Sequence, residues 1–208
     1  MSYRWEKAVG IAALTLVAAC QKEQAPQAAA AGPAKGTKEW KIQNAMSAAP
    51  RAIASDAAIL DYPSTPNGQM VQLRAGTNGW TCMPDDPSTP SNDPVCGDSA
   101  SFAWYAMYLQ HKPARITKVA LTYMLQGAAD ASNTDPFKMK PDSGQPWVTT
   151  GPHIMMFFPD PKVLQGMNTD WRSRRPYVMW AGTPYAHLMI PTGAQADTAA
   201  SGSGMGVM

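Results

Sequence analysis

The chain has 208 residues and a formal net charge of +2, and 45% of its residues are hydrophobic. This composition is ordinary for a globular protein, and the length suits one domain with extended ends. The sequence contains no basic patch with interleaved aromatic residues, so nucleic acid is not an expected partner.

The N-terminal twenty residues have the order of features of an export signal. A basic start precedes an apolar run over residues 8–19, which is too short to cross a bilayer but suits a signal peptide. The run ends in Val17-Ala18-Ala19-Cys20, which resembles the lipobox of bacterial lipoproteins, although Val17 replaces the usual leucine. The resemblance implies lipidation of Cys20 and, with Gln21 next, an outer-membrane anchor facing the periplasm. An ordinary signal peptide or a buried N-terminal helix is the alternative.

Two further segments are expected to lie outside the folded domain. Residues 20–41 follow the signal peptide of residues 1–19 and contain almost no bulky apolar side chain, so they are predicted to form a tether. Residues 192–208 are similar in composition and predict a disordered tail. A single globular domain is therefore expected over residues 42–191.

Short apolar stretches rich in β-forming residues, separated by Gly, Asn and Pro, predict strands within this domain. They cover residues 57–62, 70–75, 80–83, 116–125, 152–158, 177–180 and 185–190. Asn78-Gly79 predicts a tight hairpin between the second and third of these strands. Residues 181–184 predict a second hairpin loop, with Trp180 opposite Tyr185 and Val178 opposite His187.

One principal helix is expected near residues 99–112, with Asp98 or Ser99 as its cap and Pro113 as its stop. A second, short helix is predicted over residues 161–165. Strands and helices do not alternate, which argues against a parallel doubly wound sheet. The sequence thus predicts an α+β fold whose sheet is mainly antiparallel and shaped like a half-barrel or a sandwich.

Cysteine usage agrees with export. Cys82 and Cys96 form an even pair beside the lipidation candidate Cys20, and they flank a loop rich in proline and aspartate. An oxidising compartment favours a disulfide between them. A metal-thiolate site is the weaker alternative, because the chain has no Cys-x-x-Cys pair and no histidine near them.

The body of the chain, residues 45–191, is similar to a family of uncharacterised exported bacterial proteins. The motifs that carry this resemblance are GTNGWTCMPDDPSTPSNDPVC, DASNTDP, GPHIMMFFPD and PYVMWAGTPYAHLMIP. The resemblance implies a location in the cell envelope and nothing about mechanism.

Two of the three histidines share the pattern His-x-Met, namely His153 with Met155 and His187 with Met189. Alternate residues of a strand lie on the same face, so each pair presents an imidazole and a thioether together. If the strands are neighbours, the four side chains predict a copper site, because these ligands suit Cu(I). The expected hairpin register places Met179 on the opposite face. Ordinary core packing is the alternative, since methionine packs readily against aromatic rings.

Other candidate residues point to ligand contact. The expected hairpin register places Trp180 and Tyr185 around His187. Trp171 and Arg174 lie in a polar, arginine-rich stretch that could contact anionic lipid or the cell wall. Residues 130–135, DASNTD, begin like a calcium loop but lack its later glycine and glutamate, so a turn is the preferred interpretation.

The sequence contains neither a Gly-x-Ser-x-Gly elbow nor a phosphate-binding loop with lysine. We therefore expect a lipid-anchored envelope module without catalysis, which binds a small ligand or an envelope partner and needs no cofactor. One alternative is a periplasmic protein that handles copper through the paired His-x-Met strands. Another is a small hydrolase or isomerase with His153 or His187 as its base.

Overall fold

The computed structural model describes residues 32–65 and 68–193, so the expected signal peptide and Cys20 lie outside the described residues. Helices, strands and 3-10 turns follow one another in this order: α1 (Lys38–Met46), α2 (Arg51–Ala54), β1 (Ala58–Asp61), β2 (Val71–Arg74), β3 (Trp80–Met83), β4 (Val95–Asp98), α3 (Ser99–Leu109), β5 (Ala120–Met124), β6 (Ala128–Asp130), β7 (Val148–Thr150), β8 (His153–Phe157), η1 (Pro161–Leu164), η2 (Trp171–Ser173), β9 (Tyr177–Met179) and β10 (His187–Pro191).

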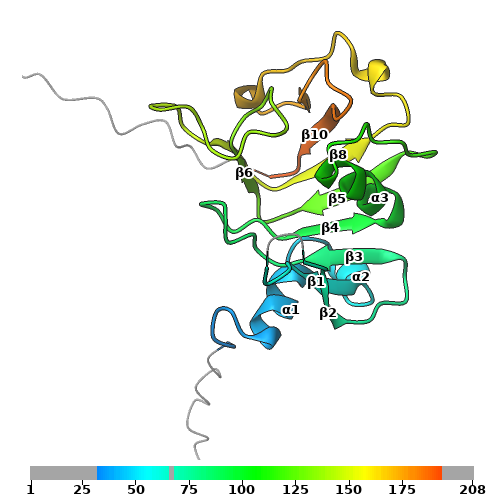
Figure 1. Ribbon diagram of the computed structural model, residues 1–208, viewed down its shortest axis with the longest axis vertical. Helices are drawn as coiled ribbons and strands as arrows, with labels where there is room; N and C mark the ends of the chain where they lie inside the picture. Colours follow the sequence, from blue (N-terminus) through cyan, green and yellow to red (C-terminus); the bar gives the residue numbers. More distant parts are fainter. Residues whose placement is uncertain (1–31, 66–67, 194–208) are drawn as a thin grey trace, which may run out of the picture. The chain divides into compact units, whose positions relative to one another are not determined.

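The main sheet has eight strands in the order β2-β1-β3-β4-β5-β8-β10-β9, and β6 and β7 form a separate pair (Figure 1). Neighbouring strands of the main sheet run antiparallel, except that β1 and β3 are parallel. The predicted α+β class, with a mainly antiparallel sheet and one principal helix, is confirmed, and the sheet is open.

The principal helix, α3, begins where the sequence predicts. The Asp98 side chain accepts a hydrogen bond from the backbone N–H of Ser101 at 2.8 Å, which satisfies one of the free donors of the first turn. Gly97 precedes this cap, and a Cβ atom there would lie 2.1 Å from Ser101 Oγ and 2.9 Å from Thr122 Oγ1. The missing side chain therefore allows the start of α3 to approach the sheet closely.

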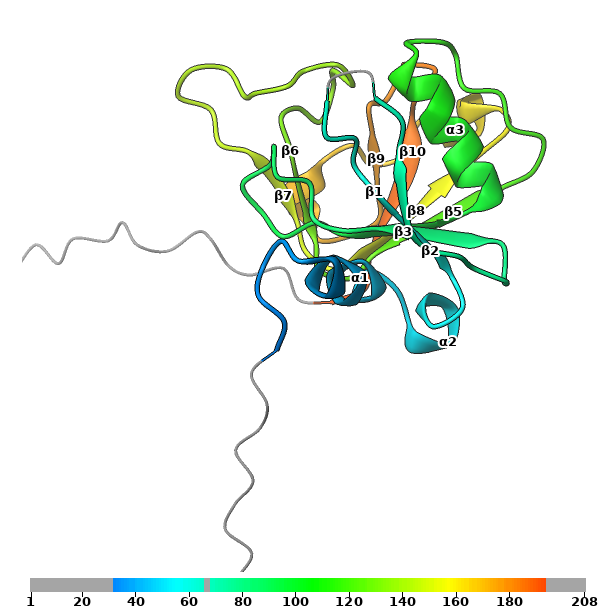
Figure 2. The ribbon, with the colours of Figure 1, turned by 60° about the horizontal axis from the view of Figure 1, so that its bottom comes forward.

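The helices cover opposite faces of the sheet. Figure 2 shows α3 on one face, and α1 and α2 on the other. Because side chains alternate along a strand, Cys82 and Cys96 lie on the α1 face, where they are buried with Ile59. The face under α3 carries larger side chains, including Trp104 from the helix and Phe157 from β8. This second face holds the candidate site.

The hairpin predicted around Asn78-Gly79 is wrong. β2 pairs with β1, and β1 also pairs with β3, so β1 lies between the two strands that were expected to be neighbours. Asn78 instead caps the loop, because its side chain donates to the carbonyl of Ile53 and accepts from the backbone N–H of Trp80. The residues between β2 and β3 therefore cross the end of β1 rather than forming a tight turn.

The folded part also starts earlier than residue 42. Helix α1 begins at Lys38, within the segment expected to be a tether, and the Thr37 side chain caps it by accepting from the N–H of Trp40. Lys41 then forms an ion pair of 2.6 Å with Asp61 on β1. The sequence gives little sign of this helix, because its amphipathic pattern is weak and its only fully buried residue is Ala45.

The predicted disulfide is confirmed. Cys82 on β3 lies directly opposite Cys96 on β4, and their sulfur atoms are bonded. Crosslinking two residues with a sequence separation of 14 restricts the unfolded chain. In the chain-entropy model, this contributes about 3 kcal/mol to the free energy of unfolding.

Replacement of both cysteines by serine is expected to lower the free energy of unfolding by about 3 kcal/mol. Urea denaturation of the wild type, with and without reductant, and of the Cys82→Ser/Cys96→Ser variant measures this effect. Reductant should destabilise the wild type and leave the variant unchanged. Equal stability of all samples would contradict the prediction.

Candidate ligand-binding cavity

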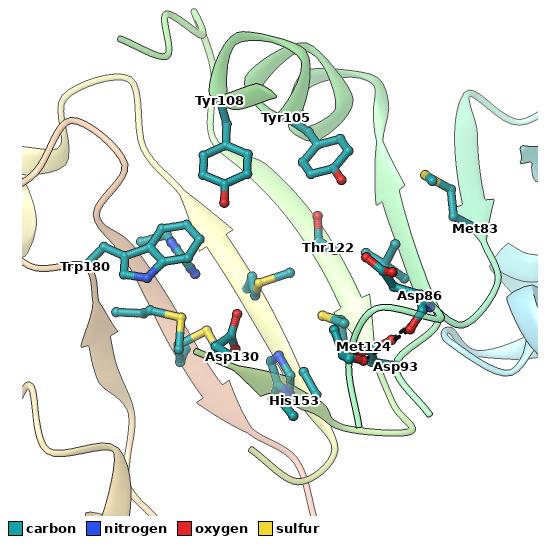
Figure 3. A pocket seen from close by; sticks show the side chains of 18 of the residues that line it. Met83, Asp86, Asp93, Tyr105, Tyr108, Thr122, Met124, Asp130, His153 and Trp180 are labelled. Atoms are coloured by element: carbon teal, nitrogen blue, oxygen red, sulfur yellow. Dashed lines mark hydrogen bonds between the residues drawn. The ribbon is translucent and has the colours of Figure 1, made fainter. Parts of the chain in front are cut away.

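A cavity of about 270 Å³ lies between α3 and the face of the sheet that α3 covers. Its floor is formed by the strands β3, β4, β5, β8, β10 and β9. Tyr105 and Tyr108 of α3 lie above it (Figure 3). The lining residues from the floor are Met83, Val95, Thr122, Met124, His153, Met155, Phe157, Met179, His187 and Met189. Asp86, Asp93 and Asp130 reach the cavity from the loops and strand ends around it.

The strand register brings the two His-x-Met pairs onto one surface. β8 and β10 are antiparallel neighbours, and Met155 lies directly opposite Met189. His153 and His187 lie on the two sides of this methionine pair, each two residues earlier along its own strand. All four predicted ligands therefore line the same cavity.

Met179 also lies on this surface, which corrects the register expected for β9 and β10. Met179, rather than Val178, is directly opposite His187. The connection is longer than the expected loop because Trp180 leaves the strand with a positive φ of 53°. Its backbone N–H donates to the carbonyl of Asn133, and its indole Nε1–H donates to the carbonyl of Ser132. This docking shifts the pairing by one residue, which reverses the face that Met179 occupies.

The two imidazoles have the same local arrangement. His153 Nδ1 lies 2.7 Å from the carbonyl oxygen of Gly151, and His187 Nδ1 lies 3.0 Å from that of Tyr185. A carbonyl oxygen only accepts, so each Nδ1 carries the proton and each Nε2 keeps a free lone pair. Both side chains are buried, and both Nε2 atoms lack a hydrogen-bond partner among the described residues.

Burial is the main cause that lowers the pKa of both histidines to about 4, and for His187 the nearby His153 contributes to the same value. The imidazoles are therefore neutral at pH 7. A base with so low a pKa is a weak catalyst at neutral pH, and neither Nδ1 is oriented by a carboxylate. The arrangement favours the lone pairs as ligands rather than as general bases.

Carboxylates line another part of the cavity. Burial, with a smaller contribution from the negative charge of Asp93, raises the pKa of Asp130 to about 7. Burial also raises the pKa of Asp93 to about 6, although its hydrogen bond from the Thr89 hydroxyl opposes this rise. Figure 3 shows the Asp130 side chain pointing into the cavity between Trp180 and His153.

Of the four residues predicted to contact a ligand, only Trp180 lines the cavity. Tyr185 is buried next to it, with its ring 6.0 Å from that of Trp104, and lies outside the lining. Trp171 and Arg174 also lie outside the lining, on and after η2, where the Arg172 guanidinium stacks 4.1 Å from the Trp171 ring. Trp171 still packs against the core cluster that contains Trp180 and Tyr185, whereas Arg174 is exposed.

Asp130 is the last residue of β6, and the residues after it form a turn, as the sequence favours. The Ser132 hydroxyl accepts from the N–H groups of Thr134 and Asp135, and the Asp135 carboxylate accepts from the N–H of Phe137. Within residues 32–65 and 68–193, no group of three or more His, Cys, Asp or Glu side chains is placed to hold a metal ion.

Sequence reasoning missed several residues of the cavity. The sequence pattern around Asp130 predicts only a turn, although its side chain lines the cavity. A signal was present for Met124, which alternates with Thr122 along a predicted strand and lies directly opposite His153. No sequence pattern predicts that Asp93 lines the cavity, because the conformation of a loop sets its position.

Comparisons with protein-family models, curated proteins and solved structures gave no match. The helices of the described part of the chain are each too short or too polar to span a bilayer. The chemistry of the cavity therefore carries the functional argument.

Proposed function

We propose that this protein is a non-catalytic module that binds a small cationic ligand in its cavity. We further propose that lipid on Cys20 anchors the protein to the bacterial outer membrane. The observation that carries the binding function is the excess of electron-pair donors in the cavity lining. Both Nε2 atoms have a free lone pair, the methionine thioethers are weak acceptors, and Asp130 provides a carboxylate.

Three of the nearby hydrogen-bond donors are engaged with the protein. The Tyr108 hydroxyl donates to the carbonyl of Pro136, the Trp180 indole to Ser132, and the Ser101 hydroxyl to Asp98. A ligand that enters the cavity thus meets acceptors and aromatic rings. A cation is favoured by both, through charge attraction to Asp130 and through the faces of Trp and Tyr rings.

The location rests on the chain's N-terminal pattern and its cysteines. Val17-Ala18-Ala19-Cys20 resembles a lipobox, and Cys20 would place acyl chains in the membrane. The Cys82–Cys96 disulfide is typical of proteins that fold in an oxidising compartment. Both observations support an exported protein whose cavity faces the periplasm.

A small cation is expected to bind the purified full-length protein and to raise its melting temperature, because ligands that bind only the folded state stabilise it. Tetramethylammonium and Ag(I) serve as organic and soft-metal probes, with glycerol as the neutral comparison. Tryptophan fluorescence reports binding directly, since Trp104 and Trp180 line the cavity. If neither tetramethylammonium nor Ag(I) changed the melting temperature or the fluorescence, the proposed function would be overturned.

Asp130→Asn is expected to weaken cation binding about tenfold or more, because it removes one of the three carboxylates that reach the cavity while keeping the shape of the side chain. Asp56→Asn is the matched control, since Asp56 is exposed and lies outside the lining.

Wild-type affinity should also fall by about tenfold or more between pH 8 and pH 5.5, as Asp130 takes up a proton through its pKa of about 7. Equal affinities of both variants, or a flat pH profile, would contradict this role of Asp130.

A further inference from the structure

We propose that the ligand is a linear aliphatic diamine, with one ammonium group at the acidic end of the cavity and the other at His187. This inference rests on the proposed function and names the chemical class of its ligand. The cavity is slightly smaller than the usual sites for drug-sized molecules, which measure about 300–1,000 Å³, so the ligand is small.

The two histidines mark opposite ends of the cavity floor. Met155 is directly opposite Met189, whereas His153 is opposite Pro191 and lies two positions to one side of the methionine pair. His187 lies two positions to the other side, so the imidazoles are four positions apart, or about 13 Å along the strands. Metal–nitrogen bonds are about 2 Å long, so the four ligands predicted from the sequence do not form a single copper site. An elongated molecule, in contrast, can contact both ends.

Two carboxylates lie beyond the ends of β3 and β4. These strands end at the pair Met83–Val95, and Asp86 and Asp93 belong to the loop that joins them. The same end of the sheet continues through Met124 on β5, which is directly opposite the histidine that begins β8. Both carboxylates are therefore at the His153 end of the cavity.

The third carboxylate, Asp130, lies at this acidic end as well. Figure 3 shows its side chain beside His153, and Asp93 lies close enough to raise its pKa. The buried Nε2 atom of His153 has no hydrogen-bond partner among the described residues. An ammonium group at this end would therefore have both negative charge and a free lone pair to bind.

The charge of the lining calls for two positive charges on the ligand. Among the described residues that line the cavity, three are aspartates and one is a lysine, Lys138, so the ionised lining has an excess of two negative charges. The Lys138 ammonium also pairs with the Asp142 carboxylate at 2.6 Å, outside the lining. A divalent cation compensates the excess, whereas a monovalent cation leaves half of it.

The other end of the cavity, at His187, combines one acceptor with aromatic rings. The imidazole lies 5.0 Å from Phe157, 5.1 Å from Trp180 and 5.8 Å from Trp104, measured between ring centroids. Its Nε2 atom is buried without a partner among the described residues, which carries a free-energy cost. An ammonium group would donate to this lone pair and would be attracted by the nearby ring faces.

The floor between the two ends is apolar. The pair formed by Met155 and Met189 occupies it, and methionine adapts readily to the shape of its neighbours, which suits a methylene chain. The acceptors at the ends require N–H donors. A primary ammonium group supplies three such donors, whereas a quaternary ammonium group supplies none.

The test is isothermal titration calorimetry of the purified full-length protein with diaminobutane, diaminohexane and diaminooctane. Each diamine is compared with the monoamine, the bis-trimethylammonium compound and the diol of the same chain length. At one chain length or more, the diamine should bind at least about tenfold more tightly than all three comparison compounds, because a hydrogen bond to a charged group contributes about that much to affinity.

His187→Leu should remove the advantage of the diamine, because it deletes the acceptor at the aromatic end. The diamine should lose about tenfold or more in affinity, while the monoamine of the same length keeps its affinity. A purely structural role of His187 would instead weaken both ligands equally. His111→Leu is the matched control, since His111 is exposed and lies outside the lining. Far-UV circular dichroism checks the fold of each variant, and the comparison of ligands on the wild type tests the proposal without any variant.

The outcomes separate the two proposals. Monoamine or tetramethylammonium binding that depends on Asp130, without an advantage for any diamine, would overturn the diamine and leave the cation-binding function standing. A diamine advantage that persists in His187→Leu would overturn the assignment of the second ammonium group to His187. Failure of the diamines, tetramethylammonium and Ag(I) alike would overturn both proposals.

Discussion

Trp104→Ala is expected to lower the free energy of unfolding by about 3–5 kcal/mol, the usual range for removing a buried tryptophan. The Trp104 ring is almost fully buried and lies 4.4 Å from Phe157, 5.7 Å from Tyr108 and 6.5 Å from Trp180, measured between ring centroids. It connects α3 to the sheet, so its loss removes contacts on both elements. Chemical denaturation, followed by far-UV circular dichroism, measures the change.

Trp40→Ala is the control for this prediction. Trp40 lies in the first turn of α1, is half-buried and contacts the Lys35 ammonium 5.5 Å from its ring. Its replacement should have a clearly smaller effect, because surface changes rarely alter stability much. If both variants lose the same stability, the buried aromatic cluster is not the main link between α3 and the sheet.

Acid is expected to remove a stabilising contribution of His187 worth about 2–3 kcal/mol between pH 7.5 and pH 4.5. The folded-state pKa of about 4 lies below the ordinary value of 6.5. Between these values the unfolded chain binds a proton that the folded chain does not. The contribution is therefore fully present above pH 6.5 and is lost as the pH falls toward 4. Urea denaturation of the wild type and His187→Gln at both pH values measures it.

The comparison with a variant is needed because Asp93 and Asp130 act in the opposite direction. Their raised pKa values of about 6 and about 7 mean that the folded state binds protons first, which stabilises it as the pH falls. The difference between the wild type and His187→Gln should shrink on acidification, while His111→Gln serves as the exposed control. A difference that does not change with pH would show that His187 is not buried in its neutral form.

Local sequence patterns were sufficient for several elements because their causes are local. Asp98 and Pro113 bracket α3, and the only cysteines outside the lipobox pattern form the disulfide. The short helix predicted over residues 161–165 is the 3-10 turn η1, and Asp160 caps it by accepting from the N–H of Lys162. The caps and turns involve residues near each other in the chain. The disulfide could be predicted because only two cysteines remain once Cys20 is assigned to the lipobox pattern.

Non-local contacts explain the errors. β4 is short and contains Gly97, so it gave no strand signal, yet it lies in the middle of the sheet. β1 separates β2 from β3 because the chain passes across its end, which no pattern within either strand could indicate. The register of β10 against β9 depends on hydrogen bonds between Trp180 and residues 132–133, which are remote in sequence.

By itself, the sequence determined that His153 and Met155, and likewise His187 and Met189, share a face, because alternation along a strand is a local property. Only the tertiary structure decided that these faces meet, that Met179 joins them and that Asp130 lies beside them. Those facts depend on strand order, register and loop docking, which arise from packing between distant segments. The paired motif is thus local, whereas the candidate site is a product of the fold.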